Sequence, residues 1–139
     1  MRKMSDLVRD QSPLTLPPTA TVMEAAEQMK KRRVGAALVT KNDDVLVGIF
    51  TGRDAIGRVL AEGRNPATTP LAEVMTGDPC TLTPKHTTIE ALRLMQDVGC
   101  RHVPIVWEGK LLGVVSQGDF RGLELDRIEE ETALWERLG

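Results

Sequence analysis

The chain has 139 residues, which is enough for one ordinary domain or for two very small ones that share a core. Its contents of 41% hydrophobic and 27% charged residues are typical of a globular chain and exclude a disordered one. The 18 basic and 20 acidic residues nearly cancel, so no overall field draws the chain to nucleic acid or anionic lipid.

The N-terminal stretch "MRKMSDLVRD" lacks the apolar centre of a signal peptide, and no apolar run approaches the length of a membrane span. Cys80 and Cys100 are too few for a disulfide scaffold, and we expect them to be reduced, small buried apolar residues. The sequence therefore predicts a cytoplasmic protein with no membrane partner and no nucleic-acid partner.

The first elements along the chain are a short strand, a helix and a hairpin. In "PLTLPPTATVMEAAEQM", residues 13–29, Thr21 and Glu24 have the spacing of a capping box, and the apolar residues that follow have helical spacing. The runs "GAALVT" and "VLVGIF" predict two strands, joined by a turn at residues 42–44. A second helix is expected from "TGRDAIG" at Thr51.

The same order of elements returns later in the chain. "PCTLTPKHTTIEALRLM" aligns with the earlier segment at an offset of 66 residues (Pro13 and Pro79), and Thr87 and Glu90 repeat the capping box. "HVPIVW" and "LLGVV" predict two more strands around a turn at residues 108–110, and "SQGDFRG" follows at Ser116.

This organisation predicts an α+β fold made of two βαββα copies packed about a pseudo-two-fold axis, since neither copy alone could bury much core. We place the first copy at residues 1–66 and the second at 67–125, with the boundary in the Pro-containing stretch after the first copy. Residues 126–139 have helix-compatible spacing, and the tail packs on its own module or contributes Trp135 and Leu138 to a dimer surface.

The repeated βαββα unit, the "RHVPIV" strand and the "LLGVVSQGD" junction resemble the CBS domain, named after cystathionine β-synthase. The resemblance covers Leu7 to Leu125, and the first copy departs from the pattern at Leu38, where the second copy has Pro104. It implies a regulatory module that binds an adenosine nucleotide, first AMP and alternatively ATP, ADP or NAD. It also implies a homodimer, an effector protein that the sequence does not identify, and no catalysis.

The two junctions, Thr51-x-x-Asp54 and Ser116-x-x-Asp119, have two interpretations. In one, each is a helix cap whose carboxylate is well placed against the helix dipole. In the other, which the resemblance implies, the two aspartate oxygens accept hydrogen bonds from the hydroxyls of a ribose. One residue can do both.

The resemblance implies two nucleotide clefts, each combining the junction of one copy with the strand and leading segment of the other. The first cleft is predicted to contain Thr51, Arg53, Asp54, Asp78, Cys80, Cys100, Arg101 and His102. The second is predicted to contain Ser12, Leu14, Val34, Gly35, Ala36, Ser116 and Asp119.

The two predicted clefts differ in charge. The first gathers Arg53, Arg101 and His102, and guanidinium groups form forked, charge-assisted hydrogen bonds with phosphate. The second has Gly35 and Ala36 in place of Arg101 and His102. We therefore expect the first cleft to bind the phosphate-bearing nucleotide.

A catalytic or metal site is not predicted. Cys80, His86, Cys100 and His102 lack the paired spacings that arrange four ligands around zinc. No G-x-G-x-x-G or Walker-type phosphate loop occurs in the sequence. The alternatives that remain are a structural or dimerisation module with vestigial clefts, and a binder of NAD through its adenosine half.

Overall fold

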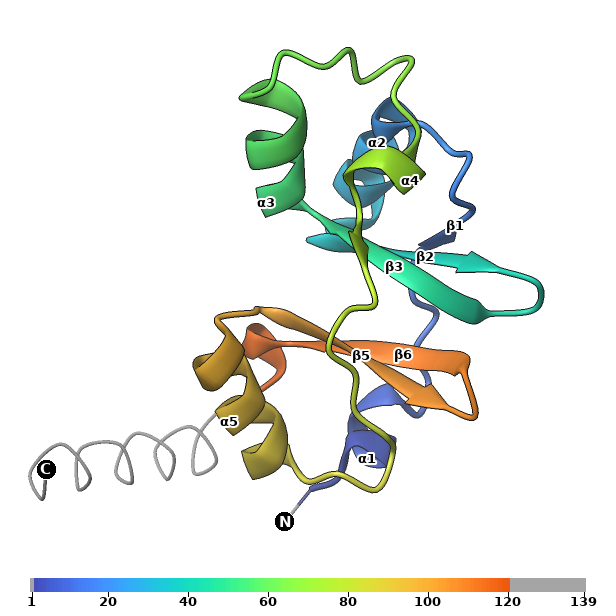
Figure 1. Cartoon of the computed structure of the whole chain (residues 1–139). Helices are drawn as coiled ribbons and strands as arrows, with labels where there is room; N and C mark the ends of the chain where they lie inside the picture. The colour runs from blue at the N-terminus through green and yellow to red at the C-terminus, as the bar shows by residue number, and fades with distance from the viewer. Residues whose placement is uncertain (1, 121–139) are drawn as a thin grey trace, which may run out of the picture. The chain divides into compact units, whose positions relative to one another are not determined.

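The computed structural model describes residues 2–120, and the predicted tail at 126–139 lies outside them (Figure 1). The chain divides into two compact units that do not follow its order. The first-copy unit consists of Ser12–Cys80 and Val106–Leu111; the second-copy unit takes the described residues of Met1–Gln11, Thr81–Ile105 and Leu112–Gly139.

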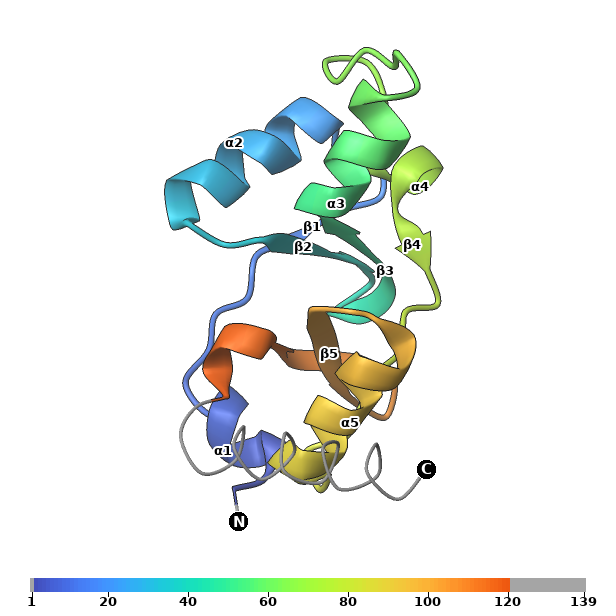
Figure 2. The same ribbon diagram turned by 90° about the vertical axis from the view of Figure 1, so that its left-hand side faces the viewer.

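The first-copy unit is a small sheet with its helices on one side, as Figures 1 and 2 show. Strand β2 pairs antiparallel with β3, β1 is parallel to β2, and β4 is antiparallel to β3. The turn segment Val106–Leu111 groups with this unit, where Lys110 pairs with Val45. The elements of the unit are β1 (Thr15–Leu16), α2 (Val22–Arg32), β2 (Ala36–Lys41), β3 (Val45–Thr51), α3 (Gly52–Asp54), η1 (Ala55–Leu60), α4 (Leu71–Val74) and β4 (Thr76–Gly77).

Local sequence signals set the bounds of α2. Thr21 accepts a hydrogen bond from the Glu24 amide and the Glu24 carboxylate accepts one from the Thr21 amide, so the predicted capping box is confirmed. The helix ends at Arg33, whose φ of 56° is left-handed and whose amide bonds back to the last turn. Its inner face buries Val22 and Ala25.

The second-copy unit repeats this plan around β5 (His102–Trp107) and β6 (Lys110–Ser116), which are neighbours in the strand order. Helix α5 (Thr88–Val98) has the predicted cap of Thr87 and Glu90 and ends at Gly99, whose φ is 79°. A single parallel bridge between Leu82 and Ile105 stands where the first copy has β1. The short helices α1 (Met4–Val8) and η2 (Gln117–Asp119) complete the described unit.

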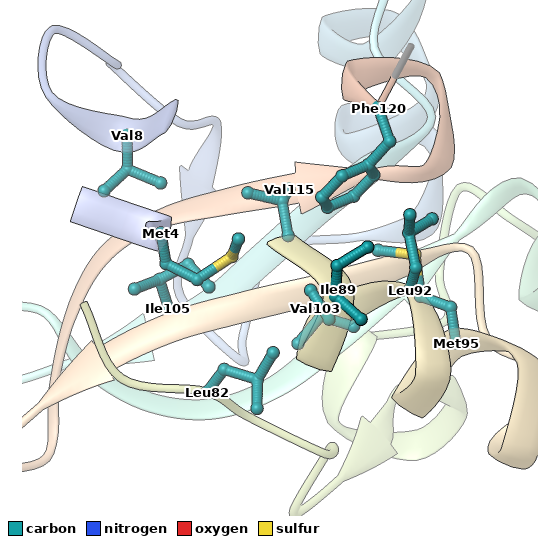
Figure 3. Close-up of a cluster of buried hydrophobic side chains, with 11 residues drawn as sticks. Met4, Val8, Leu82, Ile89, Leu92, Met95, Val103, Ile105, Val115 and Phe120 are labelled. Carbon is teal, nitrogen blue, oxygen red and sulfur yellow. The ribbon is translucent and has the colours of Figure 1, made fainter. Parts of the chain in front are cut away.

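The cores show that the short helices at the start of the two copies are exchanged. Helix α1 lies at the start of the first copy, yet Met4 and Val8 are buried in the core of the second-copy unit. Helix α4 lies at the start of the second copy, yet Leu71 and Val74 are buried in the core of the first-copy unit. Figure 3 shows the second-copy core, formed by Ala91 and the labelled residues Met4, Val8, Leu82, Ile89, Leu92, Met95, Val103, Ile105, Val115 and Phe120.

Two equivalent glycines admit the exchanged segments. A Cβ on Gly48 would collide with the side chain of Met75, which follows α4. A Cβ on Gly113 would lie 2.7 Å from Val8 of α1. The absence of a side chain at both positions lets each exchanged segment lie directly on its strand.

The described chain contains no helix with both the length and the apolar character required to span a bilayer.

Candidate functional site

Each hairpin brings the start of its first strand beside the junction at the end of its second strand. In the first-copy unit, Ala36 pairs with Thr51, and the Gly52 amide donates a hydrogen bond to the Gly35 carbonyl over 3.3 Å. In the second-copy unit, the Gln117 amide donates to the Arg101 carbonyl over 3.0 Å. The strand residues predicted to read an adenine edge therefore lie beside the acidic motif of their own copy.

The Thr51 junction forms the predicted cap. The Asp54 Oδ2 atom accepts hydrogen bonds from the Thr51 amide over 2.9 Å and from the Thr51 hydroxyl over 3.1 Å. The Asp54 amide donates in return to the Thr51 hydroxyl oxygen over 3.3 Å. The helix that begins here continues as η1, a π-helix in which the Ala61 amide bonds to the Ile56 carbonyl.

The Ser116 junction repeats this geometry. The Asp119 Oδ2 atom accepts from the Ser116 amide over 2.6 Å and from the Ser116 hydroxyl over 3.3 Å. Two sites 65 residues apart (54 and 119) thus hold a carboxylate by the same oxygen and the same donors.

The cap uses only one oxygen of each carboxylate. An ionised carboxylate has about four acceptor positions, and the two cap bonds fill those of Oδ2. The Oδ1 atom takes no part in either cap. The sequence-based interpretation had both oxygens accept from a ribose, whereas the structure leaves Oδ1 as the atom for additional donors.

At Asp54, the Oδ1 atom faces Arg58. The Arg58 Nε atom lies 3.7 Å from it, and the exposed fractions of the two side chains are 51% for Arg58 and 12% for Asp54. The Arg58 Nη1 atom also donates to the carbonyls of Met75 over 2.8 Å and of Val74 over 3.3 Å. Sequence reasoning missed Arg58, although its spacing of four residues from Asp54 on a helix was a usable signal.

At Asp119, the neighbouring ionisable group is His102. Burial lowers the pKa of His102 below its ordinary value of 6.5, the Asp119 carboxylate raises it, and the Arg101 guanidinium lowers it further. The first junction therefore has the Arg58 guanidinium at its carboxylate. The second has an imidazole that is neutral near pH 7, and the Arg2 guanidinium donates to the Asp119 main-chain carbonyl over 3.3 Å.

The segments predicted to close the clefts, residues 12–14 and 78–80, differ in exposure and in their contacts. Ser12 is exposed and its carbonyl accepts a hydrogen bond from the Arg32 guanidinium, whereas the Leu14 side chain is buried and its carbonyl accepts from the Leu38 amide. Asp78, with a left-handed φ of 48°, follows β4 at the end of that strand away from Thr51.

The remaining predicted residues divide by exposure. Val34 and Arg53 are exposed, and Cys100 is partly buried against the second-copy core. Cys80 is exposed, so the expectation that both cysteines are buried apolar residues is wrong for Cys80. Cys80 lies three residues after β4, outside the helices and strands of the described chain.

His86 has a structural contact. Its Nδ1 atom accepts a hydrogen bond from the Thr83 amide over 3.0 Å, in the turn before α5. Within residues 2–120, no group of three or more His, Cys, Asp or Glu side chains is arranged to hold a metal ion.

A family model for the CBS domain matches residues 4–61 and again residues 71–126. The chain belongs to the CBS domain family. The two βαββα copies read from the sequence are these two CBS domains, and the resemblance is confirmed. The assignment of each junction to the strand of the other CBS copy, and the boundary at residue 66, stay predictions.

Curated relatives support the assignment. The chain is 36% identical over 119 residues to the CBS domain-containing protein YhcV of Bacillus subtilis, covering 86% of this chain and 81% of that protein. It is 36% identical over 102 residues to CBSCBSPB1 of Arabidopsis thaliana, covering 73% of this chain. This chain spans only 19% of the length of that plant protein, and similarly small shares of several other plant relatives.

Among solved structures, a CBS domain protein of Pyrobaculum aerophilum complexed with AMP is similar to this chain. The TM-score is 0.81 at 28% identity, and the likeness covers 94% of this chain and 99% of the archaeal one.

Proposed function

We propose that this tandem CBS chain binds an adenosine nucleotide, AMP first, and acts as a regulatory module that signals its occupancy to an effector protein. The observation that carries the proposal is the shared geometry of the two junctions. Asp54 and Asp119 are each fixed through Oδ2 by a hydroxyl residue three positions earlier, and each keeps Oδ1 outside the cap.

This geometry suits a ribose. The 2′- and 3′-hydroxyls of a ribose are adjacent donors, and a carboxylate oxygen held in one orientation accepts from them without losing further side-chain entropy. Exposed Arg53, the residue before Asp54 in the first junction, supplies a cation for phosphate.

The archaeal protein complexed with AMP supports the choice of ligand class, since its likeness extends over nearly the whole of both chains. We assign the phosphate-bearing nucleotide to the cleft of Asp54. This assignment rests on the family pattern.

The mechanism that we propose is differential binding. A nucleotide that binds one arrangement of the tandem CBS copies better than another shifts the population toward that arrangement, and an effector protein distinguishes the two. The proposal needs no covalent step, and the chain acts as a binding protein without catalysis.

We also propose that the chain forms a homodimer. Ile56 and Leu60 are 65% and 69% exposed on η1, one turn apart, while Val59 of the same helix is buried at 1%. An apolar pair on the outer side of a helix is a typical surface for a second copy.

Calorimetry tests the ligand class. We expect AMP to bind and GMP and CMP to bind much more weakly, and equal or better binding of a guanine nucleotide would contradict the proposal. Thermal shifts with AMP, ADP, ATP, NAD and S-adenosylmethionine then rank the adenosine ligands, because a ligand of the native state raises the melting temperature. A flat response to all five would favour a structural or dimerisation module with vestigial clefts.

A further inference from the structure

The Arg58 guanidinium lies between the Asp54 carboxylate and the main chain at the end of α4. Arg58 Nη1 donates to the Met75 carbonyl over 2.8 Å and to the Val74 carbonyl over 3.3 Å. Its Nε atom lies 3.7 Å from Asp54 Oδ1, the carboxylate oxygen outside the cap. All four residues belong to the first-copy unit.

The carbonyl end of this connection is anchored. The side chains of Leu71 and Val74 are buried, with exposed fractions of 0% and 1%, and Met75 packs against Gly48 of β3. The next residues, Thr76 and Gly77, pair with β3. The guanidinium is therefore held by a fixed segment, and that segment leads directly to Asp78.

We propose that Arg58 is a positioning residue for nucleotide binding: it orients the Asp54 carboxylate and couples its occupancy to the segment Val74–Asp78. This inference rests on the proposed nucleotide-binding function. The Nε–Oδ1 separation exceeds hydrogen-bond length, so Arg58 sets the direction of Oδ1 electrostatically and leaves its lone pairs to the ribose hydroxyls.

The contribution of this ion pair to folding is small. Arg58 is half exposed, and ion pairs between exposed side chains contribute little to the free energy of unfolding. The main effect of the pair is therefore on the orientation of Asp54 and on the main chain that Arg58 holds.

The second junction lacks this arrangement in its sequence. Four residues after Asp119 the chain has Leu123, an uncharged residue, where the first copy has Arg58. The coupling that we propose is thus specific to the first CBS copy, and it gives the two junctions different responses to the same nucleotide.

Calorimetry with AMP on Arg58→Gln tests the positioning role. We expect AMP affinity to fall by about three- to tenfold, because residues in contact are energetically coupled. Arg58→Lys should recover part of the loss, because it keeps the charge. Arg64→Gln is the matched control: Arg64 pairs with Glu73 over 2.9 Å on the same unit, and its removal should leave AMP affinity unchanged.

A double-mutant cycle separates positioning from direct contact with the nucleotide. If Arg58 acts through Asp54, the loss caused by Arg58→Gln shrinks or disappears in an Asp54→Asn background. Fully additive losses would indicate that Arg58 contacts the phosphate itself and would overturn the positioning role.

Hydrogen exchange of the main-chain amides tests the coupling. Adding AMP to the native chain should slow exchange in residues 74–78, and Arg58→Gln should abolish that slowing and speed exchange of the same residues without ligand. If Arg58→Gln binds AMP as tightly as the native chain does and its amide exchange is unchanged, the role of Arg58 is refuted, whereas the proposed nucleotide binding is not. Failure of the native chain to bind AMP would instead refute the proposed function, and with it the coupling.

Discussion

The Gln11 side chain hydrogen-bonds to both main-chain polar groups of Val114. Its Nε2 atom donates to the Val114 carbonyl over 2.9 Å, and its Oε1 atom accepts from the Val114 amide over 2.9 Å. In the first-copy unit the equivalent place beside β3 is taken by the main chain of β4, where Thr76 pairs with Ile49, the counterpart of Val114. The Gln11 side chain thus supplies hydrogen bonds to the main chain of β6, as the short strand β4 does for β3.

Gln11→Ala should destabilise the second-copy unit. It removes the partners of a partly buried amide and carbonyl, and each unsatisfied group costs on the order of 1–3 kcal/mol. The measurement is the free energy of unfolding in urea. Arg9→Ala is the control, because Arg9 pairs with Asp6 at the surface and its loss should cost less than about 0.5 kcal/mol. Equal stability of the two variants would contradict this function of Gln11.

The two equivalent glycines should differ in their tolerance of alanine. At Gly113 the added methyl would lie 2.7 Å from the Cβ and Cγ1 atoms of Val8, which is buried in the second-copy core. At Gly48 it would collide with the flexible sulfur end of the Met75 side chain and would lie 3.0 Å from the main-chain carbonyl oxygen of Thr76. We expect Gly113→Ala to cost about 1–3 kcal/mol and Gly48→Ala less, as judged by thermal unfolding. A larger loss at Gly48 would show that Met75 cannot move.

The sequence predicts the parts of this molecule that local chemistry determines. Thr21 with Glu24 and Thr87 with Glu90 begin α2 and α5 as the capping boxes indicate, and these contacts span three residues. The repeat offset and the "RHVPIV" strand identify the family because they too are linear patterns.

The exchange of α1 and α4 between the units was not predictable in this way. Met4 and Val8 are separated in the sequence from Val115 by more than a hundred residues, and no local pattern indicates which core they join. The contacts of Arg58 could not be predicted for a related reason. Its acceptors are the main-chain carbonyls of Val74 and Met75, and every residue has such an acceptor. The exposure of Cys80 likewise depends on which segments pack beside it, and the neighbouring sequence does not indicate these.

Stability should fall with acid through His102. Burial and Arg101 lower its pKa below 6.5, so the unfolded chain takes up the proton before the folded one does. Above pH 6.5 His102 is neutral in both the folded and the unfolded state, and it contributes no pH dependence to the free energy of unfolding. As the pH falls through 6.5, the unfolded state is protonated first, and the free energy of unfolding falls until the folded state is protonated too. Melting temperatures between pH 7.5 and 5 should therefore drop less in His102→Gln than in the native chain.

Asp119→Asn should shift the acid dependence of His102 in a defined direction. The substitution removes the carboxylate that raises the pKa of His102. The free energy of unfolding should therefore continue to fall to a lower pH than in the native chain. An acid dependence that neither substitution changes would contradict His102 as its source.

The exposed pair on η1 should control assembly. If Ile56 and Leu60 contact a second copy, the native chain has about twice its mass of 15.3 kDa in solution, and Ile56→Asp makes it monomeric by burying a charge in the contact. Light scattering measures both masses. Leu112→Gln, which alters an exposed apolar residue on β6, should remain dimeric. A native monomer at tens of micromolar, on the order of ordinary assay concentrations, would contradict the homodimer.

Asp54→Asn distinguishes a helix cap from a cap that also binds nucleotide. Asparagine has the same shape and can keep one acceptor on the Thr51 amide, so the cost to folding should be a few tenths to about 1 kcal/mol. If Asp54 binds the ribose, loss of the charge-assisted bond should cost roughly 1.5–3 kcal/mol of AMP binding, on the order of ten- to a hundredfold in affinity. Asp119→Asn should reduce affinity less, because we assign the phosphate-bearing nucleotide to the cleft of Asp54. Unchanged AMP affinity in Asp54→Asn beside a clear loss in Asp119→Asn would reverse that assignment, and the nucleotide would then belong to the junction whose aspartate lies near His102 instead of Arg58.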